Sequence, residues 1–175
     1  MLNPKIKILL ACLDQAYDHK SWHGSNLRGS IRGLTAQEVS WRPTPRRHNI
    51  WEIIVHAAYW KYIVYRRLSD EPRGPFPLKG SNWFVRPHES TEAAWKADVT
   101  LLADMHVSLR AAVAKLNPKD LYKIPPGSKL SHFALISGIA AHDLYHAGQI
   151  QLLKRLANEK QARQLFAKNT VLKNS

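Results

Sequence analysis

The chain has 175 residues, of which 45% are hydrophobic and 22% charged, as expected for one globular domain, and this composition excludes disordered and low-complexity proteins. No apolar run reaches the roughly 20 residues of a membrane-spanning helix, so we expect no membrane segment. Lys and Arg outnumber Asp and Glu by 26 to 13, which gives a formal net charge of +13. Because the excess lies at the two ends of the chain, we expect solvated basic termini and no specific nucleic-acid binding.

The first helix is predicted from about Pro4 into the twenties, with a bend near Ser21–Ser25. It carries the one cysteine of the chain, Cys12, so no internal disulfide forms and a reducing, cytoplasmic location is expected. Residues 9–12 also look like a lipoprotein cleavage site, but too few apolar residues precede the cysteine for a secretion signal. We expect Cys12 to be a buried core thiol on an amphipathic helix.

Capping and proline signals separate the first helix from the second. Thr35 and Glu38 have the spacing of a capping box, which predicts a short helical turn. Pro43, with a second proline two residues later, then favours an extended connection. The second helix is predicted to begin near Asn49, and its apolar residues keep a 3.6-residue period to Leu68.

A long irregular connection follows the second helix. Residues 69–90 are rich in proline and glycine but also contain phenylalanine and tryptophan. A connection of this length in a compact domain is usually functional or packed on the surface as a lid, so residues 76–84 are a candidate pocket wall. The third helix is predicted from Ser90 or Thr91 to just before Asn117.

The fourth helix is predicted from its cap, Ser131, to about Ala157, where the apolar stripe ends. Strand patterns are nearly absent, so the sequence predicts an all-α fold arranged as an antiparallel four-helix bundle. We expect residues 1–157 to form a single domain and residues 158–175 to form a basic C-terminal tail.

Three of the nine histidines fall on helix faces that should be buried. Helical steps of three and four residues from Leu135 lead through His142 and His146. On the second helix, similar steps from Ile53 lead to His56. A buried imidazole without partners costs about 1 to 3 kcal/mol, so three of them facing one core indicate a compensating interaction.

A metal ion would supply that interaction. His142 and His146 are four residues apart, which places both rings on one helical face where they can bind one ion. His56 adds a third ligand, and three protein ligands leave a position open for water or substrate, as in catalytic sites. Zn, Ni, Fe and Co all suit three imidazoles. The alternative is a core in which these histidines bond to one another, to backbone or to Tyr145.

His19 and His23 are also four residues apart. They precede the predicted helix bend and flank Trp22, so we expect a pocket-lining or surface role for these two histidines rather than a second metal site. Trp22 and His23 are candidate pocket-wall residues. The remaining histidines fall at loops, helix starts or polar faces and are assigned no role. They are His48, His88, His106 and His132.

Five segments carry a family resemblance: Trp22-His23-Gly24, Trp41-Arg42-Pro43, Ile50 to His56, Thr91 to Trp95, and Gly138 to Ile150. Together they resemble the DinB/YfiT-like superfamily of metal-binding four-helix bundles, over most of the chain. The resemblance implies a divalent metal, often Zn or Ni, held by His56, His142 and His146 near one end of the bundle, and frequently a homodimer. Some relatives are transferases or isomerases that depend on a low-molecular-weight thiol such as bacillithiol, mycothiol or glutathione.

Three functions remain open at this point: a metal-dependent thiol S-transferase acting on a small molecule, a metal-dependent hydrolase of a small substrate, and a non-catalytic dimer that binds metal or a ligand. No catalytic residue is assigned.

Asp143, Tyr145 and Gln149 are candidates to hold the metal-binding rings, each by accepting a hydrogen bond from the ring nitrogen that does not bind the metal. Adjacent positions on a helix point apart, so Asp143 more readily serves a neighbouring helix than His142. Gly148, in mid-helix, is expected to allow close helix packing.

Overall fold

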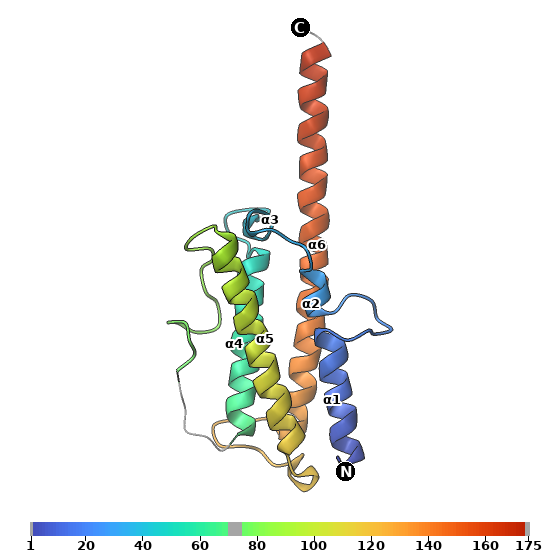
Figure 1. The fold of residues 1–175 in the computed structure, drawn as a ribbon, viewed down its shortest axis with the longest axis vertical. Coiled ribbons are helices and arrows are strands. Elements are labelled where there is room, and N and C mark those ends of the chain that lie inside the picture. The colour runs from blue at the N-terminus through green and yellow to red at the C-terminus, as the bar shows by residue number, and fades with distance from the viewer. Residues whose placement is uncertain (1, 70–74, 174–175) are drawn as a thin grey trace.

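The computed structural model describes residues 2–69 and 75–173, with side chains as far as Lys160. Within these ranges the chain forms helices and no strand, which confirms the all-α prediction (Figure 1). The elements are α1 (Pro4–Tyr17), α2 (Leu27–Ser30), α3 (Ala36–Ser40), α4 (Ile50–Leu68), α5 (Glu92–Lys115), the 3₁₀ helix η1 (Pro118–Asp120) and α6 (His132–Lys173).

The starts of three helices agree with the capping signals in the sequence. Thr35 and Glu38 form the predicted capping box at α3, where the Glu38 amide donates to Thr35 Oγ1 and the Thr35 amide donates to Glu38 Oε2. Asn49 caps α4, because its Oδ1 accepts from the Glu52 amide at 2.8 Å. Thr91 caps α5 in the same way. Each cap stabilises its helix by about 1 kcal/mol and fixes where it begins.

The first helix is shorter than predicted. α1 ends at Tyr17, and the chain becomes helical again only over Leu27–Ser30 in α2. Gly24 lies between them with a φ of +98°, outside the helical region. The prediction that Cys12 is buried is wrong: its side chain is exposed, because the next residue, Leu13, takes the inward position on α1.

The four long helices α1, α4, α5 and α6 form the bundle, and their contacts fix their directions. Trp51, early in α4, donates to Asp98, early in α5. Lys61 and His106, each further along, are also in contact. These two helices therefore run in the same direction, as do α1 and α6, and the two pairs oppose each other (Figure 1). The arrangement differs from a simple antiparallel bundle because the long connection between α4 and α5 returns the chain to the end at which α4 begins.

The last helix is longer than predicted. α6 continues past Ala157 to Lys173 and projects beyond the other helices (Figure 1). No glycine or proline follows Gly148 in the sequence, and good helix formers fill the segment, so no local signal stops the helix. The division into a domain and a basic tail at residue 158 stays a prediction. Neither α6 nor any other described helix is long and apolar enough to cross a membrane.

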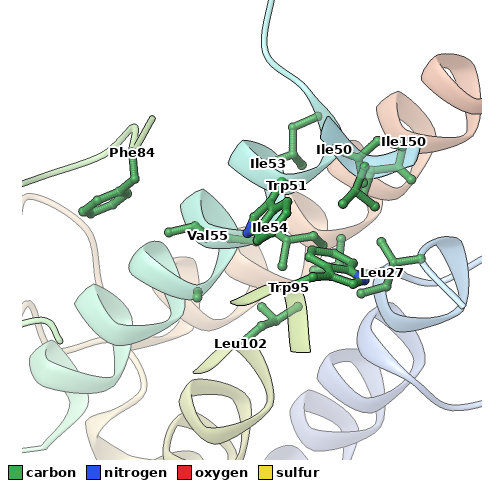
Figure 2. Packing of buried hydrophobic residues seen from close by; sticks show 14 of the residues in the cluster. Leu27, Ile50, Trp51, Ile53, Ile54, Val55, Phe84, Trp95, Leu102 and Ile150 are labelled. Carbon is green, nitrogen blue, oxygen red and sulfur yellow. The ribbon is translucent and has the colours of Figure 1, made fainter. Parts of the chain in front are cut away.

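Two apolar clusters fill the bundle, one toward each end. Figure 2 shows the first, in which Trp51 of α4 packs edge-on against Trp95 of α5 with 5.4 Å between ring centroids, and Ile150 of α6 belongs to the same cluster. The second includes Leu13 of α1 and Leu109 of α5. Each fully buried side chain of this size stabilises the fold by about 1.5 to 3 kcal/mol.

A layer of buried polar residues separates the two clusters. Along α4, α5 and α6, four of its members lie between residues of the first cluster and residues of the second, and His56 lies beside first-cluster residues, five positions before Lys61. They are His56, Lys61, His106, Asp143 and His146. Polar groups in the middle of a bundle destabilise it unless they are paired, so the partners of this layer indicate what it is for.

Candidate metal centre

Three histidine rings from two helices meet at this polar layer: the buried His56 and His146, and the half-buried His142. α4 supplies His56, and α6 supplies His142 and His146 one turn apart. The Nε2 atom of His142 lies 3.1 Å from Nε2 of His56 and 3.0 Å from Nε2 of His146. One ring nitrogen of each residue lies within 4.8 Å of the other two. The positions that the apolar period turned inward are therefore brought together at one point.

Hydrogen bonds fix the orientation of two of the rings. His56 Nδ1 donates to the backbone carbonyl of Asn82 at 2.8 Å. His146 Nδ1 donates to Oε1 of Gln149, one turn further along α6, at 2.7 Å. A neutral imidazole with its proton on Nδ1 has an unprotonated Nε2, so both rings point a lone pair at His142.

The cluster cannot satisfy itself with hydrogen bonds alone. A single proton on His142 Nε2 can bond fully to only one of its two neighbours, so one close contact between nitrogens stays unfavourable. His142 Nδ1 is buried and has no partner among the described residues. A cation at the point where the Nε2 atoms converge would remove the conflict.

The donor set also fits a metal ion by its dimensions. Metal–nitrogen bonds of about 2.0 to 2.1 Å in a tetrahedral site place the ligand nitrogens about 3.3 Å apart. The contacts made by His142 Nε2, at 3.0 and 3.1 Å, are close to that separation. The unpartnered Nδ1 of His142 departs from the usual pattern, in which each ligand ring is held by a second hydrogen bond.

Burial keeps all three rings neutral at physiological pH. It lowers the pKa of His56 to about 4, with a smaller effect in the same direction from His146, against the opposing bond to Asn82. It lowers the pKa of His142 to about 3, and the pKa of His146 is also lowered by burial. Neutral imidazole is the form that binds metals, so the site needs no deprotonation step near pH 7.

The connection before α5 covers one side of the cluster. The indole of Trp83 stacks on the His56 ring with 3.9 Å between ring centroids. It also stacks on the His48 ring, with 3.7 Å between centroids. Asn82 accepts from Trp60 Nε1 through its side chain and from His56 through its backbone, and it holds a left-handed φ of 61°. Residues 76–84, the candidate pocket wall, thus contact the cluster through Trp83, one of the aromatic residues expected there, and through Asn82, which the sequence did not single out.

The three residues expected to hold the rings behave differently. Gln149 contacts His146 as described. Asp143 points to α4 instead and pairs with Lys61, as adjacent positions on a helix require. The ring of Tyr145 lies 5.2 Å from that of His146, and its side chain is largely exposed.

The structure does not bring the other two candidate residues to the cluster. Trp22 is 100% exposed. His23 lines a separate hollow with Leu144 and Gly148 of α6. The prediction of close helix packing at Gly148 is wrong, because a Cβ built there would meet no other atom within 4 Å.

A buried charged network, which the sequence analysis missed, adjoins the cluster. Lys61 and Asp143 are both fully buried, and the Lys61 ammonium lies 3.4 Å from His106 Nδ1. Burial raises the pKa of Asp143, and the ammonium opposes that rise. His106 was assigned no role but is only 4% exposed and stacks on Tyr17. Lys61 follows Ala57 by one helical turn, so its spacing placed it on the buried face of the helix. It was passed over because a lysine is rarely buried.

Comparison with known proteins identifies the family of the chain. No curated protein and no solved structure matches the chain significantly. The sequence profile of the DinB superfamily matches residues 21–150, well over half of the chain, and this range includes all three histidines of the cluster. The chain therefore belongs to the DinB superfamily.

Proposed function

We propose that the protein binds one divalent transition metal ion, such as zinc or nickel, through His56, His142 and His146, and transfers a low-molecular-weight thiol to a small electrophile there. The observation that supports metal binding is the convergence of three Nε2 atoms whose lone pairs have no adequate protein partner. Three protein ligands leave a position for an exogenous molecule. When bound, the ion supplies a positive charge that lowers the pKa of a thiol or a water at that position.

The residues around the cluster favour a nucleophile supplied from outside. The one cysteine, Cys12, lies exposed on α1. Among the described residues, no carboxylate contacts the three rings, and the neighbouring Asp143 is engaged by Lys61. Asn82 and Gln149 orient the rings, and Trp83 shields His56 from water on one side. A cofactor thiol brings its own nucleophile and needs no further base once it is ionised.

Metal analysis tests the first part. We expect about one equivalent of transition metal in protein purified without an affinity metal column. The variant His142→Ala/His146→Ala should contain almost none. His19→Ala/His23→Ala is a matched control, since it removes another pair of histidines four residues apart from an exposed segment and should keep its metal. Failure of the parent to bind zinc or nickel even on reconstitution would overturn the proposal and favour a histidine core without metal.

Thiol dependence tests the second part. The metal-loaded protein is incubated with a small aryl halide electrophile and with glutathione, mycothiol or bacillithiol in turn. Product that forms only with one of these thiols supports a transferase. Product that forms in water alone would indicate a hydrolase, and no product under any condition would indicate a metal- or ligand-binding protein without catalysis.

We also propose a homodimer in the cytoplasm as the working unit. The support is the family resemblance together with an exposed stripe on α6, where Tyr145, Leu152 and Leu156 follow one another at helical spacing. Light scattering measures the mass in solution. Tyr145→Glu/Leu152→Glu should give a monomer, whereas a monomeric parent would contradict the proposal.

A further inference from the structure

A pocket with a volume of about 160 Å³ opens beside the histidine cluster, between the second half of α4 and the first half of α6. Its lining consists of apolar side chains, one glycine and two polar residues, Arg67 and His142. The lining residues are Trp60, Val64, Arg67, Leu130, Ala134, Leu135, Gly138, Ile139 and His142.

The two polar residues lie at opposite ends of the pocket. α4 and α6 run in opposite directions, so Trp60 of α4 is level with His142 of α6, and Arg67 is level with Ala134. Seven or eight helical residues separate these levels, which corresponds to about 10 to 12 Å. The pocket therefore leads from an arginine at one end, along an apolar wall, to the proposed metal centre at the other.

Arg67 differs from the arginines that hold the fold together. Arg42, Arg86 and Arg110 each pair with a carboxylate, at 3.0 Å or less. Arg67 makes no hydrogen bond or ion pair with any residue that the structure describes. A guanidinium is the preferred partner for a carboxylate or another flat anionic group, which it binds through two parallel hydrogen bonds.

Gly138 leaves part of the pocket wall without a side chain. Glycine in a helix interior costs about 1 kcal/mol relative to alanine. A Cβ built on Gly138 would meet no other atom within 4 Å, so close packing does not require glycine here. The missing side chain instead leaves the pocket wall open.

We propose that this pocket binds the acceptor molecule of the site: a small organic anion with an apolar body about the size of a benzene ring. Its anionic group pairs with Arg67, its body lies against Val64, Gly138 and Ile139, and its other end faces His142. A cavity of about 150 Å³ is large enough for benzene, which sets the size. The identity of the molecule as substrate rests on the proposed function, whereas its binding does not.

The test uses three flat probes of equal size and different charge: benzoate, benzamide and benzamidine. Each is titrated into chelator-treated, metal-free protein, and binding is followed by NMR. Because no metal is present, benzoate cannot bind by coordinating the ion with its carboxylate. We expect benzoate to bind about tenfold more tightly than benzamide, and benzamidine not at all. Failure of benzoate to bind, or equal binding of all three probes, would overturn the proposal.

Two variants separate the contributions of charge and space. Arg67→Met should reduce benzoate binding to the level of benzamide, whereas Arg155→Met, which removes an exposed arginine elsewhere, should leave the preference unchanged. Gly138→Leu should abolish binding of both probes by filling the pocket. Its unfolding midpoint should not fall, because leucine favours helix more than glycine does, and this measurement excludes misfolding as the cause. A benzoate preference that survives Arg67→Met, or binding that survives Gly138→Leu, would overturn the proposal.

Failure of this inference is distinguishable from failure of the proposed function. Metal content is measured on the same parent and variants. Arg67→Met and Gly138→Leu should both bind metal as the parent does. A parent that binds benzoate but no metal supports the pocket and overturns the metal-dependent function. A parent that binds metal but none of the probes overturns the pocket alone.

Discussion

Lys61 of α4 and Asp143 of α6 form an ion pair in which neither side chain is exposed to solvent. Asp143 is next in sequence to His142, so the pair joins the two helices that carry the histidine cluster. Moving two charges out of water costs several kcal/mol for each ion, and the second carboxylate oxygen of Asp143 has no partner among the described residues. We infer that the pair fixes the positions of α4 and α6 relative to each other more than it stabilises the fold.

Removing one partner of this ion pair should therefore lower the free energy of unfolding more than replacing both partners. Asp143→Leu should lower the free energy of unfolding by about 3 to 5 kcal/mol, because it leaves the Lys61 ammonium buried without its carboxylate. The double variant Lys61→Met/Asp143→Leu should recover most of that loss, since two apolar side chains then face each other. Urea denaturation followed by circular dichroism measures both values. A double variant no more stable than Asp143→Leu would contradict this account.

Gln149 holds the His146 ring through Nδ1, and its loss should weaken the site without unfolding the protein. We expect Gln149→Ala to reduce zinc affinity about 10- to 100-fold, measured by competition with a chromogenic chelator. Gln151→Ala is the matched control, because the Gln151 amide donates to Ser25 Oγ instead of contacting the cluster, and its loss should not affect zinc affinity. Equal zinc affinity of Gln149→Ala and the parent would show that this bond does not position the ring.

The left-handed backbone of Asn82 places the carbonyl that holds His56. Asn82→Gly keeps this conformation available, whereas Asn82→Val strains it by about 1 to 3 kcal/mol. Both variants remove the side chain that accepts from Trp60, so their difference isolates the backbone. We expect Asn82→Val to bind zinc more weakly than Asn82→Gly in the same competition assay. The reverse order, or equal affinities, would contradict a positioning role for this carbonyl.

His106 makes stability depend on pH. Burial lowers its pKa from 6.5 to about 3, the Lys61 and Arg110 cations act in the same direction, and Asp14 opposes them. Between these two pH values the unfolded chain binds a proton here that the folded protein does not, so the stability present above about pH 6.5 is lost progressively as the pH falls.

His106→Phe keeps a ring against Tyr17 and removes the titrating nitrogen. The free energy of unfolding of this variant should fall less steeply between about pH 6.5 and about pH 4 than that of the parent, by up to about 1.4 kcal/mol per pH unit. Urea denaturation at several pH values in this range measures the two slopes. Parallel slopes would show that His106 titrates normally in the folded protein.

The apolar period located the histidine cluster because it relates positions on one face of a helix, whichever helix lies opposite. It identified His56, His142 and His146 without information on which helices are neighbours. His106 obeys the same spacing, four residues after Leu102, but Met105 fits the stripe equally well and obscured it.

Two features could not be predicted from the pattern. Irregular backbone has no period, so the contacts of Asn82 and Trp83 with the cluster depend on a path that only the folded chain defines. Helix direction is also absent from the pattern, because the spacing of apolar residues is the same in both directions along a helix. The length of the connection between α4 and α5 is compatible with parallel neighbours, but it was interpreted as a lid or functional segment, and the bundle was predicted to be antiparallel.

The parallel pairing of α4 and α5 affects how the site can evolve. Since α4 and α5 run in the same direction, the connection between them leads from one end of the bundle back to the other (Figure 1), and its residues Asn82 and Trp83 contact His56 of the cluster. The segment that covers the cluster is therefore irregular surface chain, which accepts substitutions and insertions that a helix would not. Substitutions in this segment can therefore change which molecules reach the three histidines, while the helices that carry the histidines stay the same.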